Sequence, residues 1–338
     1  MAELIRGESA QQGTYGGESV ERRLPDQLGD GWAYHWEGLN RAHAALAGGE
    51  TMLGMCTLFS TLGHARSVLV HEDWKRFCQA CLSHPIREFV HQDPIARRSF
   101  ARPRGYAGDA VLLDLMYRTD MPEQTRASKL GQQLCQFMYE QPSAISLRWR
   151  RDMLARRIDE IAQERPSARI LSVACGHLRE AQLSEAVRER RLGRFVALDQ
   201  DPKSLAVVQR ELVPLGVEAV PGSVKALLRG QQTFSDLDFV YAAGLYDYLP
   251  QSVAIRLSRI LFSMLRAGGR LLLANYTDST FDTGCKAYME AFMDWWLIYR
   301  EEPELREWLQ DIPRNELASQ RLFRDDIGNI AYIEAVRR

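Results

Sequence analysis

The stretch RILSVACGHLREAQLSEAV, residues 169–187, indicates the fold of the larger part of the chain. Its short apolar beginning, residues 169–174, favours a strand that is covered on both faces. After a turn that contains Gly176, apolar residues return at helical spacing over residues 178–187. A strand, a glycine turn and a helix form the start of a nucleotide-binding unit, so we expect a ligand at this turn.

The sequence divides into three parts around this stretch. Residues 1–25 are polar and lack a helical period, so we predict a disordered segment or a flexible lid. Residues 26–165 carry apolar side chains at three- and four-residue spacing, which predicts an α-helical N-terminal cap domain. Strand-like runs alternate with helices over residues 166–338, which predicts an α/β domain with a mostly parallel sheet.

The composition excludes several classes of partner. Of the 338 residues, 46% are hydrophobic and 26% are charged, as in ordinary globular proteins. The net charge of −1 gives no reason to expect a nucleic-acid or membrane partner. There is no long apolar run, and the polar beginning lacks the apolar core of a secretory signal. We predict a cytoplasmic monomer or homodimer that acts on a small molecule.

One group of side chains suggests a metal site. Cys78, Cys81, His84 and His91 are close in sequence, and the two cysteines have the Cys-x-x-Cys spacing of some zinc sites. Cysteines three residues apart beside apolar residues are equally typical of a buried helix face. Because no second ligand pair completes a zinc set, we predict no metal.

The second predicted strand ends in Asp199, about 20 residues beyond Gly176, where an acidic residue can accept hydrogen bonds from ribose hydroxyls. Asp201 directly precedes Pro202 and is assigned to the cap of the next helix. The alternative is that Asp199, like Asp201, only caps the next helix. We disfavour it because Asp199 stands at the end of the predicted strand.

The glycine count favours a nucleotide ligand without a pyrophosphate. Residues 177–179 are His, Leu and Arg, where dinucleotide-binding loops carry further glycines. S-adenosylmethionine (SAM) has adenine, ribose and a methionine tail but no phosphate. We predict that SAM lies at the ends of the first four strands, against Ala174, Cys175, Gly176, Asp199, Gln200, Gly222, Ser223, Val224, Ala243 and Gly244.

The order of these segments resembles the class I SAM-dependent methyltransferases over residues 166–338. LSVACGHLRE resembles the first motif of that family, ALDQDP its acidic ribose motif, PGSV its adenine segment and AGGRLLLANY its fifth strand. The resemblance implies a Rossmann-like domain with a mostly parallel seven-stranded sheet.

Two further stretches, HPIREFVHQDPIARRSFARPRGYAGDAVLLDLMY and YMEAFMDWWLIYR, resemble a bacterial subfamily in which a helical cap precedes the SAM domain. Its members include enzymes that make 3-hydroxypalmitic acid methyl ester. They also include azetidine-2-carboxylate synthases, which cyclise SAM and release methylthioadenosine. The resemblance implies a SAM-consuming enzyme. We favour cyclisation, because a tyrosine-rich wall suits a small zwitterion, and keep methyl-ester formation and a SAM-binding sensor as alternatives.

Polar and aromatic residues near strand ends or in the RPRGYAGD loop are the candidates for chemistry. Aromatic faces attract the sulfonium of SAM. The side-chain oxygen of Asn275 can accept a hydrogen bond from the reacting amine, and Asp109 or Asp247 can take a proton. Aromatic side chains over residues 288–299 recur at helical spacing, so we assign them to the core. The predicted catalytic residues are Asn275, Tyr246, Tyr106, Tyr276 and Asp109.

Overall fold

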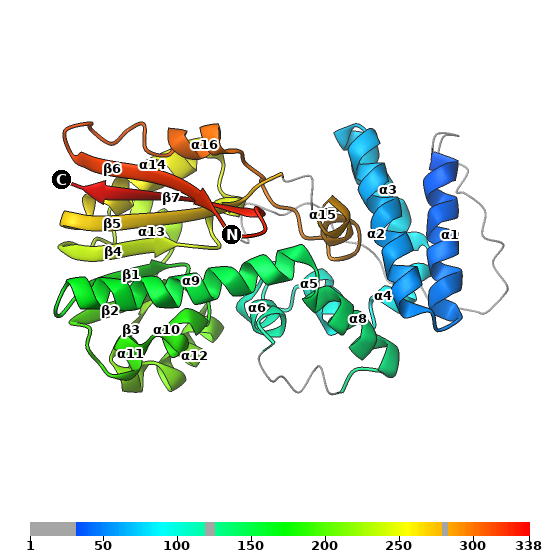
Figure 1. Ribbon diagram of the computed structural model, residues 1–338, viewed down its shortest axis with the longest axis horizontal. Helices are drawn as coiled ribbons and strands as arrows, with labels where there is room; N and C mark the ends of the chain where they lie inside the picture. Colours follow the sequence, from blue (N-terminus) through cyan, green and yellow to red (C-terminus); the bar gives the residue numbers. More distant parts are fainter. Residues whose placement is uncertain (1–31, 119–125, 279–282) are drawn as a thin grey trace. The chain divides into compact units, whose positions relative to one another are not determined.

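The computed structural model describes residues 32–118, 126–278 and 283–338, so the predicted flexible segment, residues 1–25, lies outside the described residues. The chain forms two compact units (Figure 1). The helical unit takes residues 32–115, 126–141 and 283–296, and the sheet unit takes residues 116–118, 142–278 and 297–338. Among the described residues, no helix combines the length and the apolar character that crossing a membrane requires.

The helical unit contains no strand in its described part. Its helices are α1 (Ala33–Ala47), α2 (Thr51–Val68), α3 (His71–Ser83), α4 (Ile86–Val90), α5 (Pro94–Ala101), α6 (Ala110–Met116), α8 (Lys129–Tyr139) and α15 (Thr283–Phe292). Although α15 is far away in the sequence, it packs against α2 and α3. The packing is close because α2 and α15 meet at two glycines, Gly63 and Gly284.

Polar contacts fix α15 within the helical unit. The carboxylate of Glu290 is buried and accepts hydrogen bonds from Arg66 Nε at 3.0 Å and Trp74 Nε1 at 2.6 Å. The backbone oxygen of Phe292 bonds to His91 Nε2 at 2.8 Å. A buried carboxylate is costly unless it is paired, so this arrangement specifies one register of α15.

The two cysteines weighed as zinc ligands lie on one buried face of α3. Cys78 and Cys81 are almost fully buried, and burial raises the pKa of both thiols well above the ordinary value. Within the described ranges, no group of three or more His, Cys, Asp or Glu side chains is arranged to hold a metal ion.

The sheet unit alternates strands and helices. Its elements are α9 (Pro142–Glu164), β1 (Arg169–Val173), α10 (Arg179–Leu183), α11 (Glu185–Arg188), β2 (Arg194–Asp199), α12 (Pro202–Glu211), η3 (Val213–Leu215), β3 (Val217–Pro221), α13 (Val224–Leu228), β4 (Leu237–Ala242), η4 (Tyr246–Tyr248), α14 (Gln251–Ser263), β5 (Leu265–Tyr276), α16 (Glu302–Glu307), β6 (Leu317–Arg324) and β7 (Ile330–Arg337).

The sheet has seven strands in the order β3-β2-β1-β4-β5-β7-β6. Pairs among β1 to β5 are parallel, and β7 runs antiparallel to β5 and β6. This is the arrangement of the class I methyltransferase fold. The predicted fold, a mostly parallel seven-stranded sheet preceded by helices, is therefore confirmed.

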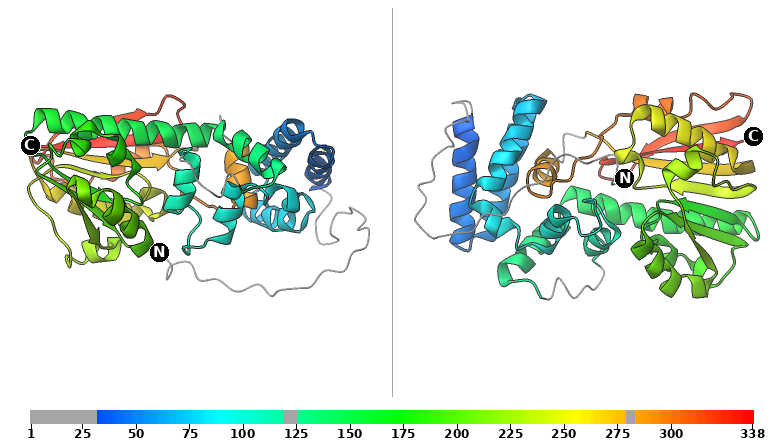
Figure 2. Two further views of the ribbon diagram at one scale, coloured as in Figure 1. Left: turned by 90° about the horizontal axis from the view of Figure 1, so that it is seen from below. Right: turned by 180° about the vertical axis from the view of Figure 1, so that it is seen from behind.

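Helices cover both faces of the sheet (Figure 2). On one face, Leu171 and Val173 of β1 share an apolar core with Leu257 and Leu261 of α14. On the other face, the hydroxyl of Tyr241 of β4 reaches across to a carboxylate of α10. The alternation of side chains along each strand produces these two faces.

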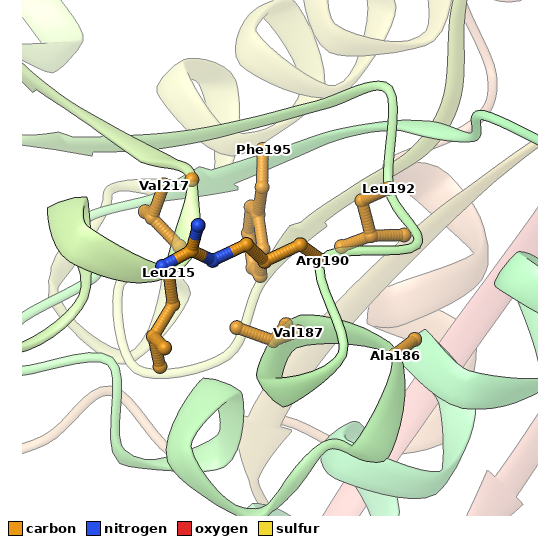
Figure 3. A pocket seen from close by; sticks show the side chains of 8 residues that line it. Ala186, Val187, Arg190, Leu192, Phe195, Leu215 and Val217 are labelled. Carbon is orange, nitrogen blue, oxygen red and sulfur yellow. The ribbon is translucent and has the colours of Figure 1, made fainter.

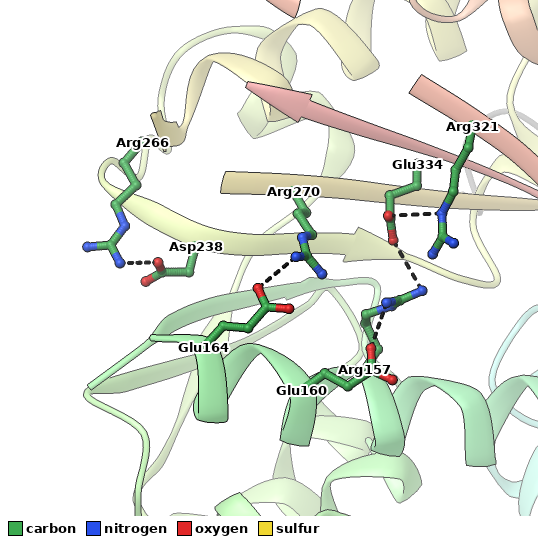
Figure 4. Close-up of polar contacts among 8 residues, drawn as sticks. All are labelled: Arg157, Glu160, Glu164, Asp238, Arg266, Arg270, Arg321 and Glu334. Carbon is green, nitrogen blue, oxygen red and sulfur yellow. Dashed lines mark hydrogen bonds and ion pairs between the residues drawn. The ribbon is translucent and has the colours of Figure 1, made fainter. Parts of the chain in front are cut away.

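Ion pairs attach α9 to the sheet (Figure 4). Arg157 of α9 lies 3.5 Å from Glu334 of β7, which also pairs with Arg321 of β6 at 3.1 Å. Near the end of α9, Glu164 pairs with Arg270 of β5 at 2.6 Å. These contacts place α9 in the sheet unit, whereas the boundary expected near residue 166 assigns it to the cap. The opposite holds for α15, which lies in the helical unit.

The aromatic run over residues 288–299 is helical only in its first part. Helix α15 ends at Phe292, and Asp294 has a positive φ of 46°, which a continuing helix does not allow. Beyond it the chain is extended: Ile298 N donates to the backbone oxygen of Asp247 at 2.8 Å, and Arg300 N to that of Tyr276 at 3.0 Å. The helical spacing of the aromatic residues beyond Phe292 was therefore misleading.

We expect Gly284→Ala to destabilise the protein. A Cβ at Gly284 would lie 2.9 Å from the backbone oxygen of Phe59, which cannot move without shifting α2. Overpacking of this kind costs about 1–3 kcal/mol of unfolding free energy. The matched control is Gly48→Ala, where the nearest atom would be 3.4 Å away and φ is −76°. Urea denaturation measures both, and equal midpoints would contradict the close packing of α2 and α15.

Candidate cofactor-binding site

The loop after β1 has the backbone of a glycine-rich loop. Three alternate residues have positive φ: Ala174 at 54°, Gly176 at 57° and Leu178 at 52°. Left-handed backbone costs a residue with a Cβ about 1–2 kcal/mol. Gly176 is therefore not the only residue of this loop with a left-handed backbone. Ala174 and Leu178 adopt the same conformation at a cost in free energy.

Leu178 and Ala174 differ in how that strain is offset. The Leu178 side chain is buried, which contributes about 1.5–3 kcal/mol, and it precedes helix α10. Ala174 is exposed, so its side chain contributes little. Loop closure comes from two backbone bonds, Cys175 N to the oxygen of Leu198 at 3.1 Å and Leu178 N to that of Cys175 at 3.0 Å.

Asp199 joins the end of β2 to this loop. Its Oδ2 accepts a hydrogen bond from Gly176 N at 2.8 Å, and its Oδ1 accepts one from Asp201 N at 2.8 Å. Burial raises the pKa of Asp199, although these hydrogen bonds oppose the shift. A third backbone N–H, that of Gln200, also bonds to this carboxylate. A carboxylate has about four acceptor positions, so it can still accept a bond from a hydroxyl donor.

The cap predicted for Asp201 is confirmed. Its side chain accepts hydrogen bonds from Lys203 N and from the Ser204 hydroxyl, each at 2.9 Å, at the start of α12. The two acidic residues therefore have different roles. Asp201 caps α12, and Asp199 accepts a hydrogen bond from the loop that follows β1.

The structure brings the other predicted binding residues to the same edge of the sheet. Gly222 N donates to the backbone oxygen of Asp199 at 2.9 Å, and a Cβ at Gly222 would lie 2.5 Å from Leu198 Cδ1. Ser223 caps α13 by accepting from Ala226 N at 3.2 Å. Because β1 to β4 are parallel, the residues after each strand share the carboxyl edge, namely Ala174, Cys175, Gly176, Gln200, Gly222, Ser223, Val224, Ala243 and Gly244.

Asn275 is not available to align a substrate amine. It is fully buried, and its Nδ2 donates to the backbone oxygens of Tyr276 at 2.7 Å and Ile298 at 2.8 Å. Its Oδ1 accepts from Arg300 Nη1 at 2.8 Å. These bonds tie β5 to the extended segment after α15, so the side chain has a structural role.

Tyr246 also points into the protein core. It is fully buried, its ring centroid lies 4.6 Å from that of Trp308, and its hydroxyl bonds to Ser258 at 3.0 Å. Tyr276, which was expected after the fifth strand, is the last residue of β5, and its hydroxyl donates to the backbone oxygen of Ser143 at 3.2 Å. Following a strand end therefore does not ensure that a side chain faces the ligand edge.

The remaining two predicted catalytic residues belong to the helical unit. Asp109 is fully buried and receives two hydrogen bonds of 2.8 Å from Arg98 and a third of 2.8 Å from Leu112 N. Its two oxygens are therefore engaged by Arg98 and by the first turn of α6. Tyr106 lies in the loop before α6 and is partly exposed.

A buried polar cluster lies beside the strand ends. It joins Asp247 and Tyr276, which the sequence analysis named, with three residues that it missed, namely Arg150, Glu180 and Tyr241. Tyr241 Oη donates to Glu180 Oε1 at 2.8 Å, and Tyr276 N donates to Asp247 Oδ1 at 2.7 Å. Burial raises the pKa of Glu180, and it raises that of Asp247 to about 6 against the hydrogen bond from Tyr276. The signal in the sequence was Glu180, which directly follows the turn.

A small cavity lies at the opposite edge of the sheet (Figure 3). It is lined by Phe195 and Val217, the first apolar residues of β2 and β3, together with Val187 and Arg190. Its volume of about 40 Å³ is close to that of one or two water molecules. This cavity is too small for a nucleoside.

Comparisons with known proteins bear on the fold. No protein-family model and no curated protein matches the chain. A possible exported protein of Bordetella parapertussis is similar over 77% of this chain and 96% of its own, at 18% identity and a TM-score of 0.55.

Weaker similarities connect the chain with two methyltransferases. SibL, a SAM-dependent methyltransferase in its apo form, is similar over 75% of this chain and 74% of its own, at 15% identity and a TM-score of 0.45. Magnesium protoporphyrin IX methyltransferase of Synechocystis PCC 6803 with bound SAH is similar over 58% and 87%, at 15% identity and a TM-score of 0.43. The Bordetella match shows that the two chains share a fold, and it does not bear on activity. The two methyltransferase matches are too distant to carry a further argument.

We expect Ala174→Gly to stabilise the protein by about 0.5–1 kcal/mol, because glycine removes the cost of positive φ at an exposed position. The matched control is Ala206→Gly in the exposed interior of α12, which should cost about 1 kcal/mol. Thermal and urea denaturation measure the change in unfolding free energy of both variants, and we expect the two changes to have opposite signs. A loss of stability in both variants would show that Ala174 is not strained.

Proposed function

We propose that this chain is a SAM-consuming enzyme on a class I methyltransferase fold. The observation that carries the proposal is the loop of Ala174, Gly176 and Leu178, held by the Asp199 carboxylate at the carboxyl edge of a parallel sheet. Such a loop lets a ligand approach the backbone, and an acidic residue at the end of the second strand suits ribose hydroxyls. The order of motifs in the sequence supports SAM as that ligand.

The narrower proposal is cyclisation of SAM to azetidine-2-carboxylate. The α-amine, after losing its proton, attacks the γ-carbon of the same methionine chain. The bond between the γ-carbon and the sulfur breaks, its electron pair stays on sulfur, and methylthioadenosine leaves as a neutral thioether. PRGYAGD and DWWLIYR resemble the subfamily that includes both azetidine-2-carboxylate synthases and methyl-ester-forming enzymes, and the tyrosine-rich stretches RGY, YDY and NY favour the small zwitterion of cyclisation. Tyr276, the last residue of β5, is the predicted catalytic residue that we propose for shaping the approach of the amine.

The alternative reaction is methyl transfer to a carboxylate, which forms a methyl ester. It needs no general base, because the acceptor oxygen is already ionised, and catalysis then comes from in-line positioning. It leaves S-adenosylhomocysteine as the second product. A SAM-binding sensor would form neither set of products.

Product analysis of the purified full chain with SAM alone separates these possibilities. We expect azetidine-2-carboxylate and methylthioadenosine in equal amounts, measured by mass spectrometry. Azetidine-2-carboxylate is the decisive product, because SAM releases methylthioadenosine spontaneously, and a heat-inactivated sample corrects for that. Turnover that starts only when a fatty or small carboxylic acid is added, with S-adenosylhomocysteine as product, would replace cyclisation by methyl transfer. Binding without turnover would identify a sensor.

Asp199→Ala should weaken SAM binding by about 1–3 kcal/mol, the scale for losing hydrogen bonds to a charged group. Isothermal titration calorimetry measures the dissociation constant. The control is Asp201→Ala, which removes a helix cap and should cost about 1 kcal/mol of stability while leaving SAM affinity unchanged. An equal loss of affinity in the two variants would remove Asp199 from the ribose site.

The same titration has an expected pH dependence. Burial raises the pKa of Asp199 above its ordinary value, and only the ionised carboxylate accepts two ribose hydrogen bonds. SAM affinity of the wild-type chain should therefore fall as the pH drops through this raised pKa. Asp199→Asn should lack this part of the dependence; an identical profile would assign it to another group.

A further inference from the structure

The exposed side of α2 carries no acidic side chain and no basic one except a single imidazole. Its exposed residues are Met52, Leu53, Cys56, Ser60, His64, Ser67 and Val68. The helix has one arginine, Arg66, which turns toward the buried Glu290. The exposed side of α3, by contrast, carries Glu72, Lys75 and Arg76. Helices on a solvated surface normally have charged side chains on the outer side, so their absence from α2 indicates a face that becomes covered.

Large exposed hydrophobic side chains gather on the same part of the molecule. Of the seven among the described residues, five lie in α1, in α2 or just after α2, namely Tyr34, Met52, Leu53, Val68 and Val70. Each of the five is more than half exposed. Tyr34 of α1 lies beside α2, because its ring centroid is 5.7 Å from that of His64. We call this exposed surface of the two helices the α1–α2 face.

Helices α1 and α2 are neighbours that run antiparallel (Figure 1). A Cβ at Gly38 of α1 would overlap the side chain of Thr61, and a Cβ at Gly54 of α2 would lie 2.7 Å from Leu46 Cγ. The start of α2 therefore lies beside the end of α1. Ser60 of α2 is level with the middle of α1, just after Gly38.

The exposed side of α2 is balanced about Ser60. Cys56 and His64 each lie four residues from Ser60, and Leu53 and Ser67 each lie seven residues from it. If two copies pair with α2 antiparallel about a two-fold axis at Ser60, each contact of one copy recurs in the other. A small side chain then lies at the axis, where the helices approach most closely, and Leu53 faces the small Ser67 of the second copy.

The charges of α1 fit the same pairing. Glu37 and Arg41 are exposed and lie on either side of the level of Ser60. The two-fold axis therefore brings Glu37 of each copy toward Arg41 of the other. Glu37 accepts a hydrogen bond from Asn40 at 3.2 Å, and within the described part of the chain neither charge is in an ion pair. Two pairs of opposite charge across the axis favour this orientation and register.

The size of the face suits a reversible dimer. A helix rises 1.5 Å per residue and is about 10 Å wide, so the 18 residues of α2 with α1 beside them cover about 27 Å by 20 Å. Two such faces remove about 1,000 Å² in total from water, which is close to the lower limit for a specific interface. We therefore expect a dimer that dissociates on dilution.

We propose that the α1–α2 face joins two copies of this chain, with the two α2 helices antiparallel and Ser60 at the two-fold axis. The sequence left a monomer and a homodimer open, and this face favours the homodimer. Pairing would cover the exposed side chains of Tyr34, Leu53 and Val68 and complete the ion pairing of Glu37 and Arg41. The pairing needs no ligand, so it is independent of the proposed function.

Sedimentation equilibrium of the full chain without ligand measures the association. We expect the mass to rise from that of one chain to that of two between about 1 and 100 μM, the range of a small interface. Leu53→Glu should raise the dissociation constant at least about 10-fold, because it buries a charge in each half of the interface. An acidic residue in the first turn of α2 is compatible with the helix dipole, so circular dichroism should show a folded chain. The matched control, Gln79→Glu on the exposed side of α3, should leave the dissociation constant unchanged.

Charge reversal tests the register. Glu37→Arg and Arg41→Glu should each raise the dissociation constant about 10-fold, because each places like charges opposite one another on both sides of the axis. The double variant restores opposite charges and should associate like the wild-type chain. A double variant that associates more weakly than either single variant would exclude this register.

Cross-linking tests the position of the axis. Ser60→Cys in a Cys56→Ser background places two thiols side by side, so a short bismaleimide should link the two copies. Gln79→Cys in the same background should not be linked, because α3 lies outside the α1–α2 face. Electrophoresis under denaturing conditions measures the linked fraction.

Each result supports the pairing or overturns it. A wild-type chain that stays monomeric over this range, or a dimer that Leu53→Glu leaves intact, overturns the α1–α2 face as the contact between copies. A dimer that Leu53→Glu disrupts, but whose thiols at position 60 are not linked, overturns the axis at Ser60. None of these measurements involves SAM, so their failure and a failure of the proposed function are distinguishable.

Discussion

The hydrogen bond from Gly176 N to Asp199 Oδ2 is the contact on which the geometry of the strand ends depends. It ties the loop after β1 to the end of β2, and the backbone oxygen of Asp199 extends the connection to Gly222 after β3. A loop with two strained residues, Ala174 and Leu178, would relax without such a restraint. One carboxylate therefore sets the shape of the edge where a nucleoside would lie, and its own burial is tolerated because backbone N–H groups satisfy it.

The sheet could be predicted because its signals are local. Short apolar runs separated by amphipathic segments give parallel strands with covered faces, and the resemblance supplied the strand number. The unit to which each helix belongs was harder to predict from the sequence. The contacts of α9 with Glu334 and Arg270, and of α15 with Gly63, join residues far apart in the sequence. An amphipathic pattern indicates that a helix is covered on one side, but it does not indicate which part of the chain covers it.

The same distinction holds within the candidate site. Roles that depend on the backbone, such as the turn at Gly176 and the cap at Asp201, follow from residue type and position. Roles that depend on where a side chain points do not, as Tyr246 and Asn275 show by bonding inside the protein. Arg150 was hidden for a related reason: in a helix with several arginines, the sequence does not reveal which one is buried.

The position of α15 bears on how this protein can be divided. The chain leaves the sheet unit after β5, contributes α15 to the helical unit and returns before β6. Every residue from Cys285 to Phe292 is buried. A fragment that spans residues 142–338 would carry this helix without the α2 and α3 surfaces that cover it, and would expose its apolar side chains. The helical unit is therefore not an N-terminal segment alone, because it takes one of its helices from between β5 and β6.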